Sequence, residues 1–125
     1  MQPICDLLDR ALNDEIDFEQ FSNELLRLGV ESMTFDFVKR HHAFYASGNA
    51  VVDHPLKDDR PFNIASVFSK EKIVEALAAF DSRQITVKQF HVALASAGVS
   101  FAHVYLRATR AIYLSPQGEF YLEQW

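Results

Sequence analysis

A short acidic stretch near the start of the chain contains residue types that could bind calcium. Aligned with an EF-hand loop, Asp9 and Asn13 fall at two oxygen-ligand positions. The rest of the loop does not fit, because Ala11 stands at a ligand position, Asp14 replaces the turn glycine and Gln20 replaces the bidentate glutamate. The sequence therefore predicts no calcium loop here.

Five histidines raise the question of a transition-metal site. His41 and His42 are adjacent, so on a strand they point to opposite faces and cannot share an ion. His91 has no histidine or carboxylate one helical turn away, and His54 lies in a polar segment. Without a ligand pair at fixed spacing we predict no metal and no cofactor. These histidines are expected at the surface or at helix caps.

Cys5 is the single cysteine, which rules out an internal disulfide and a cysteine-based zinc site. It shares a helical stripe with Leu8 and Leu12, so we interpret it as a small core side chain rather than a nucleophile. The sequence also contains no phosphate-binding glycine loop and no nucleophile elbow.

The sequence contains two similar halves. Sliding it by 69 positions places "IDFEQFSNELLRLGV" (16–30) over "ITVKQFHVALASAGV" (85–99). The shared residues are those that start a helix, because a cap residue followed by Gln three positions later forms a capping box. The predicted boxes are Asp17 with Gln20 and Thr86 with Gln89.

Each of these helices is predicted to end at a glycine. Gly29 and Gly98 stand where a left-handed backbone conformation costs glycine little. Another apolar stripe of helical spacing precedes each one, from Pro3 to Leu12 in the first half and after the N-cap candidate Ser69 in the second. Each half is therefore expected to open with a helical hairpin.

After each Gly-Val pair the apolar spacing changes to two, which predicts strands. The alternating positions are Met33, Phe35 and Phe37 in the first half and Ala102, Val104 and Leu106 in the second. Turns at 39–41 and 108–109 lead to second strands over 42–46 and 110–114. Residues 115–118 suit a turn into a last strand over 119–124. Residues 47–49 are predicted to form a similar turn in the first half. A short strand is predicted over 62–65.

These elements predict an α+β fold made by internal duplication of a helix-helix-strand-strand unit with antiparallel β-hairpins. Residues 1–125 are expected to form a single domain with pseudo-repeat halves over about 1–52 and 66–125. The polar, proline-bearing segment 53–61 is predicted to be the loop that joins them.

The last three predicted strands contain one candidate interaction or ligand face. We assume that the odd-numbered residues of these strands share one face and the even-numbered residues the other. The even-numbered set is then aliphatic and lies under the helices. The odd-numbered set brings tyrosines together with a cation, an acid and an imidazole. The odd-numbered set is His103, Tyr105, Arg107, Tyr113, Glu119 and Tyr121. Amphipathic aromatic side chains are enriched at interfaces. Alternatively, the sheet of the first half packs on this face, with Phe44 at the place of Tyr113.

Composition limits the classes of partner. Hydrophobic residues make up 49% of the 125 residues, which is enough for a real core, and the formal net charge of −5 gives no overall basic field for nucleic acid. No apolar run approaches the length of a membrane span, and the start lacks the pattern of a signal peptide. We expect a cytoplasmic protein with no nucleic-acid partner and no membrane partner.

The pattern of Phe, Leu and Gly-Val followed by an aromatic hairpin, present twice, resembles a bacterial family of unknown function that includes prophage-borne YbcV-like proteins, some labelled "phage envelope protein". The resemblance covers nearly the whole chain and implies the fold but no activity. It is based on Phe21, Leu25, Gly29, Val30, Asp36, Tyr45, Gly48, Phe68, Leu77, Phe90, Ala97, Gly98, Val99, Tyr113 and Gly118.

Two functions from different classes follow from these observations. The first is a non-enzymatic binding or protein-interaction module that uses the aromatic sheet face, with a protein partner, a second copy or a small molecule as its ligand. The second is a small enzyme, such as a hydrolase, with a pocket between the halves lined by Tyr105, Arg107 and His103. A cleft with converging polar groups favours the enzyme, and a flat aromatic face favours the module.

Overall fold

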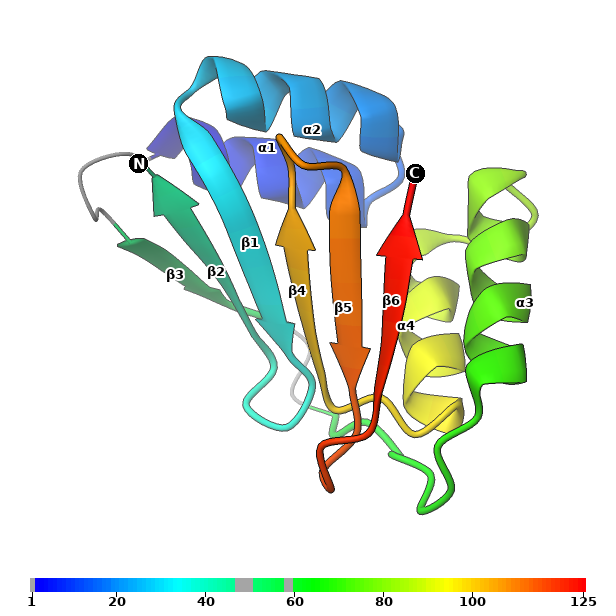
Figure 1. Cartoon of the computed structure of the whole chain (residues 1–125). Coiled ribbons are helices and arrows are strands. Elements are labelled where there is room, and N and C mark those ends of the chain that lie inside the picture. Colours follow the sequence, from blue (N-terminus) through cyan, green and yellow to red (C-terminus); the bar gives the residue numbers. More distant parts are fainter. Residues whose placement is uncertain (1, 47–50, 58–59) are drawn as a thin grey trace.

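Two helices followed by three strands occur twice along the chain (Figure 1). The structure, a computed structural model, describes residues 2–46, 51–57 and 60–125. The first half comprises α1 (Gln2–Leu12), α2 (Phe18–Arg27), β1 (Val30–Asp36), β2 (His41–Ala46) and β3 (Val51–Pro55). The second comprises α3 (Lys70–Asp81), α4 (Val87–Ser96), β4 (Phe101–Tyr105), β5 (Arg110–Leu114) and β6 (Phe120–Gln124). The predicted α+β fold is confirmed, and the turn predicted at 47–49 lies outside the described residues.

Capping boxes start α2 and α4, as the sequence predicted. The Asp17 carboxylate accepts from the Gln20 backbone N–H at 2.8 Å, and the Gln20 side chain accepts from the Asp17 N–H at 3.0 Å. Thr86 and Gln89 form the same reciprocal pair at 3.1 and 2.8 Å. Each box satisfies two of the backbone donors that a helix start leaves free.

Both glycines predicted to end a helix have left-handed backbone conformations. The φ angles are 87° for Gly29 and 90° for Gly98. After α4, the N–H of Gly98 donates to the carbonyl of Ala95 and the N–H of Val99 to that of Leu94. This is the pairing of a Schellman motif, in which a left-handed residue lets the chain leave the helix and turn into the next strand.

The six strands form one antiparallel sheet in the order β3-β2-β1-β4-β5-β6. The halves meet edge to edge, because β1 pairs with β4 and Thr34 lies opposite His103 at the centre of the pairing. The alternative in which one half packs its sheet on the face of the other is therefore wrong.

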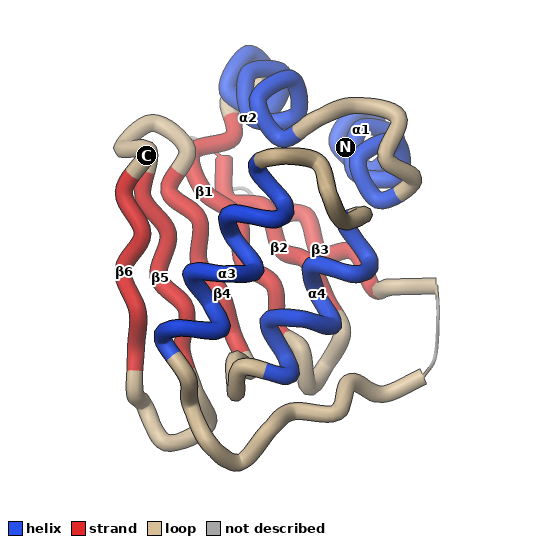
Figure 2. The backbone as a smooth tube through the Cα atoms, turned by 90° about the vertical axis from the view of Figure 1, so that its right-hand side faces the viewer, coloured by secondary structure: helices blue, strands red, loops and turns tan. Residues whose placement is uncertain are grey.

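All four helices lie on one face of this sheet, with the pair α1 and α2 beside the pair α3 and α4 (Figure 2). Buried side chains form one cluster under α3 and α4, around Leu94, and another under α1 and α2, around Leu8. Val104 packs against both clusters, and Cys5 is partly buried against the second. Among the described residues, no helix covers the opposite face of the sheet.

Two segments near the middle of the chain differ from the sequence prediction. Residues 53–55, assigned to the joining loop, belong to β3, where Asp53 pairs with Ala43. Residues 62–65 form no strand: Phe62 packs its ring against Phe37 at 5.3 Å, and the Ala65 N–H donates to the Ala95 carbonyl in α4. The apolar side chains of 62–65 therefore complete the core without joining the sheet.

Candidate functional site

The predicted tyrosine face is divided between the two sides of the sheet. Tyr113 lies directly opposite Tyr121 and next to Ala102, on the side that the helices cover, and Tyr113 is only 5% exposed. Tyr105 is on the uncovered side and is 39% exposed. The expectation that Tyr105, Tyr113 and Tyr121 share one face is therefore wrong.

The reason is the length of the turn between β4 and β5. Tyr105 pairs with Arg110, so four residues form the turn, and a hairpin with an even number of turn residues pairs odd positions with even ones. Odd-numbered residues therefore lie on the uncovered face in β4 and on the covered face in β5. Between β5 and β6 they keep the same face, because Tyr113 pairs with Tyr121.

His103 and Tyr105 form a small polar cluster on the uncovered side. Their rings stack with centroids 4.2 Å apart, and the Tyr105 hydroxyl lies 3.1 Å from His103 Nδ1. The other ring nitrogen of His103 lies 3.1 Å from Ser32 Oγ, so both of its nitrogens have partners. Partial burial lowers the pKa of His103. Arg107 is exposed in the turn after β4 and does not join this cluster.

A cavity of about 740 Å³ is lined by residues of all four helices or their flanking turns and of the sheet, and we call it the central cavity. Its wall combines residues of both halves, including Met33 and His42 from the first and Tyr113 and Val104 from the second. The predicted pocket between the halves thus has a counterpart, but His103, Tyr105 and Arg107 do not line it. They face away from it, because they lie on the uncovered side or in a turn.

Two histidines, His42 on β2 and His91 on α4, lie on the wall of the central cavity. Both stack on the Phe35 ring, with centroids 4.3 Å and 4.7 Å away. His42 is 2% exposed, and its Nδ1 has no hydrogen-bond partner among the described residues. The prediction that the histidines lie at the surface or at caps is wrong for this pair. The alternation of His42 with Phe44 was the sequence signal that could have placed His42 inside.

Both imidazoles are neutral at physiological pH. Burial lowers the pKa of His42 well below its usual value, and the neighbouring His91 adds to this effect. Burial also lowers the pKa of His91 to about 4. The His91 ring lines the central cavity and a second one beside it. A neutral imidazole offers one donor and one acceptor to a ligand.

A tyrosine and two acids contribute further polar groups to the central cavity. The Tyr113 hydroxyl donates to the Glu123 carboxylate at 2.8 Å. Burial, followed by the nearby Glu123, raises the pKa of Tyr113, so this hydroxyl stays protonated. Burial also raises the pKa of Glu123 and of Asp81 at the end of α3. Tyr113 and Glu123 thus form a hydrogen-bonded pair on the cavity wall, and Asp81 adds a carboxyl group to it.

Contacts between the halves lie among the residues that line the central cavity. Arg83 forms an ion pair with Asp17, the residue that caps α2. The Asp14 carboxylate accepts from the Val87 N–H at 2.9 Å and so caps the first turn of α4 from the other half. These contacts join the helix pair of one half directly to that of the other.

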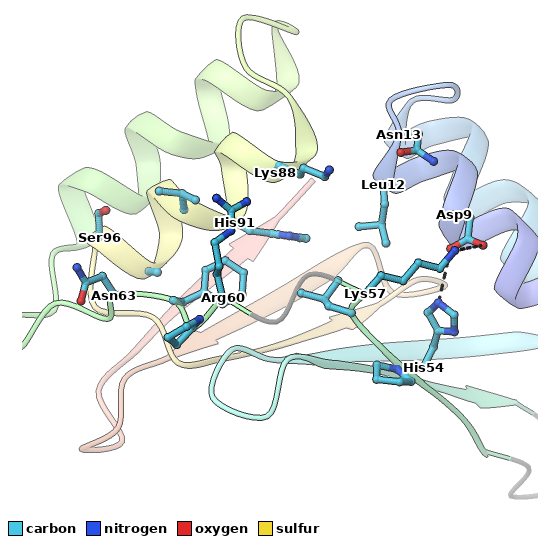
Figure 3. A pocket seen from close by; sticks show the side chains of 16 residues that line it. Asp9, Leu12, Asn13, His54, Lys57, Arg60, Asn63, Lys88, His91 and Ser96 are labelled. Carbon is cyan, nitrogen blue, oxygen red and sulfur yellow. Dashed lines mark ion pairs between the residues drawn. The ribbon is translucent and has the colours of Figure 1, made fainter.

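A second cavity, of about 490 Å³, adjoins the central one at Leu12 and His91, and we call it the cationic cavity. Figure 3 shows Lys88 on the side of α4 and Lys57 extending toward Asp9 of α1. Arg60 is the third cation on its wall. The sequence prediction missed this grouping, because Lys57 and Lys88 come from different halves of the chain.

The comparison with known protein families matches residues 8–124 to a family described as a protein of unknown function (DUF1398). The chain belongs to this family. The DUF1398 description names no activity, and none of the curated proteins matches the chain. The link to prophage-borne relatives stays a prediction.

Two further features are absent from the described part of this DUF1398 chain. No group of three or more histidine, cysteine, aspartate or glutamate side chains there is arranged to hold a metal ion. No helix there is long and apolar enough to cross a membrane.

Proposed function

We propose that the protein is a non-enzymatic module that binds a small, largely apolar molecule in the central cavity. Its volume of about 740 Å³ lies within the range of small-molecule sites, which are mostly apolar with a few placed polar groups. Phe35 and Met33 supply apolar contacts, and His42, His91 and Tyr113 supply the polar groups.

The observation that carries this proposal is the unpaired Nδ1 atom of His42. A buried polar atom without a partner costs about 1–3 kcal/mol, and such atoms are rare in folded proteins. A hydrogen bond from a ligand in the central cavity would offset this cost. The imidazole is also held in place by stacking on Phe35, so a ligand would meet a preorganised group.

Fluorescence of the neutral probe N-phenyl-1-naphthylamine, which rises in apolar surroundings, tests the proposal. We expect saturable binding to the wild type and a loss of at least tenfold in affinity for Met33→Trp, which fills the cavity. Ile112→Trp is the matched control, because Ile112 pairs with His103 on the uncovered face. Val104→Phe is a second filling variant if Met33→Trp melts early. Equal binding by all four proteins would contradict the proposal.

A second candidate is self-association through the uncovered face of the sheet. Phe120 and Leu122 are 55% and 52% exposed there, and Tyr105 on the same face is 39% exposed. Apolar patches on monomers are usually small, and two one-sided sheets can pack face to face. A second copy brings the same patch, so we expect native mass spectrometry to show a dimer that Phe120→Ser with Leu122→Ser abolishes. A monomeric wild type at micromolar concentration would refute this candidate.

A further inference from the structure

Acidic side chains outnumber basic ones on the wall of the central cavity. Six of the described residues that line it are aspartate or glutamate, and Arg83 is the one lysine or arginine among them. Arg83 is already engaged in its ion pair with Asp17. The residues outside the described part of the chain include no lysine or arginine, so their side chains cannot add a cation. Carboxylates on this wall are therefore left without basic partners.

Glu123 on β6 and Asp81 at the end of α3 are two such carboxylates, and they lie near each other. Neither forms an ion pair with a described residue, and no basic side chain is among the groups that shift the pKa of either acid. Burial raises the pKa of Glu123, and the charge of Asp81 raises it further. A cation bound beside the two acids would favour both carboxylates.

The strand pairing places His42 and Tyr113 in one row across the floor of the central cavity. His42 lies opposite Phe35, Phe35 opposite Ala102, and Ala102 opposite Tyr113. Adjacent strands are about 4.8 Å apart, so the two ends of this row are about 14 Å apart. The small side chain of Ala102 keeps the middle of the row low. An elongated molecule can therefore lie across the strands, between His42 and Tyr113.

The two ends of this row differ in charge. Tyr113 donates to Glu123, so one end adjoins the acids. The other end has the buried imidazole of His42, which is neutral at physiological pH and whose Nδ1 lacks a partner among the described residues. This unpaired atom indicates a ligand independently of the acids. A cation fits the first end, and apolar atoms with at most one hydrogen bond fit the second.

We infer that the ligand is an amine, with its ammonium group beside Glu123 and Asp81 and an elongated apolar body that extends across the sheet toward His42. This inference depends on the proposed binding function and adds the chemical class of the ligand. An ammonium group has several N–H donors and can bond to both carboxylates at once. Burial of the apolar body beside Phe35 and Ala102 adds to the affinity.

Three ten-carbon competitors that differ in their end group test the class of ligand. Decylamine is cationic, 1-decanol is neutral and decanoate is anionic, and each is titrated against bound N-phenyl-1-naphthylamine. We expect decylamine to displace this probe from the wild type at a concentration at least fivefold below that of 1-decanol, and decanoate to be the weakest. Affinity should fall roughly tenfold from decylamine to octylamine, because two fewer methylene groups are buried.

Glu123→Gln removes the charge and keeps an acceptor for the Tyr113 hydroxyl. It should weaken decylamine roughly fivefold, and the double variant with Asp81→Asn roughly tenfold. Neither variant should change the affinity of 1-decanol or of the neutral probe, which also shows that the cavity is intact. Glu75→Gln is the matched control, since it removes the same charge from an exposed position on α3 outside both cavities. It should leave every affinity unchanged.

The side-chain NMR signals of His42 test the direction in which the ligand lies. At saturation, decylamine should shift the signals of both His42 and Tyr113. Hexylamine, which is too short to span the row, should shift those of Tyr113 and move those of His42 much less. Equal shifts of His42 with the two amines would overturn the proposed orientation.

The possible failures are distinguishable. If the neutral probe does not bind, or binds regardless of Met33→Trp, the proposed function itself fails. If the probe binds in the central cavity but decylamine displaces it no better than 1-decanol does, only the inference of an amine is overturned. The same holds if Glu75→Gln weakens decylamine as much as Glu123→Gln, because the attraction would then come from the overall negative charge of the protein.

Discussion

At the scale of single residues, the two helix-ending glycines have the same conformation and different surroundings. A methyl group on Gly29 would meet no atom within 4 Å, whereas one on Gly98 would lie 2.7 Å from the Val67 carbonyl oxygen and 2.9 Å from the Phe68 Cα. Backbone atoms cannot move aside as the end of a side chain can. Position 98 therefore requires glycine both for its positive φ angle and because no Cβ fits there, whereas position 29 requires it only for the φ angle.

We predict that Gly29→Ala lowers the free energy of unfolding by about 1 kcal/mol, the cost of a left-handed conformation for a residue with a Cβ. Gly98→Ala should cost roughly 2 kcal/mol more, because the loop at 67–68 must also shift. Urea denaturation of the two variants measures the difference. Equal losses would show that the close approach at Gly98 does not matter.

The cavity histidines make stability sensitive to acid. The pKa of His91 is about 4 in the folded protein and near 6.5 in an unfolded chain, so between these values the unfolded state binds more protons. The contribution is fully present above about pH 6.5 and is lost as the pH falls toward 4. The resulting loss in the free energy of unfolding is roughly 3 kcal/mol at about pH 4.

We predict that His91→Leu flattens the dependence of the unfolding free energy on pH between 6.5 and 4, measured by denaturation at each pH. The remaining slope should come from His42, whose pKa is lowered in the same direction. Asp81 and Glu123 have raised pKa values, so they increase the free energy of unfolding as the pH falls, and they do so in both proteins. The difference between wild type and variant therefore reports His91 together with its effect on the pKa of His42, and parallel curves would contradict the burial of His91.

At the scale of elements, the register of the last hairpins decides which tyrosines are internal. Tyr113 and Tyr121 face the helices, and Phe120 and Leu122 of the same hairpin face away. Tyr113→Ser with Tyr121→Ser should lower the free energy of unfolding by roughly 3 kcal/mol or more through lost burial. The matched double variant Phe120→Ser with Leu122→Ser should cost less than half of that in the monomer. A larger loss from the second pair would contradict the register.

Local signals made the helices predictable. Asp17, Thr86 and Gly98 each act through hydrogen bonds or backbone angles within a few residues, so a pattern in the sequence is enough to place them. The faces of the strands were harder to predict. The alternation within β4 placed its residues on the correct two faces. Predicting the face of Tyr113 in β5 also required the number of residues in the turn between the two strands.

At the scale of the whole molecule, pairing of β1 with β4 creates the site. This contact joins residues far apart in the sequence, such as Thr34 and His103, and no local pattern indicates it. Once formed, it places both helix pairs on one face of a shared sheet, and the central cavity lies between them. His42 and His91 come together in the same way, from different halves of the chain, so no spacing in the sequence connects them.

The same arrangement leaves two faces with different chemistry. The covered face has the central cavity, neutral imidazoles and the Tyr113–Glu123 pair, and the uncovered face has Tyr105 and His103, which are hydrogen-bonded to each other and to Ser32. A small ligand gains more burial and more unsatisfied polar partners on the covered face. We therefore locate binding between the helices and the sheet.

An NMR titration of isotope-labelled protein with N-phenyl-1-naphthylamine tests this location most directly. We predict that the largest shift changes occur at Met33, His42 and Tyr113, with His42 side-chain signals among them. Resonances of Tyr105, Phe120 and Leu122 on the uncovered face should move little. Shift changes concentrated at those three residues, with the cavity residues unmoved at saturation, would contradict the central claim.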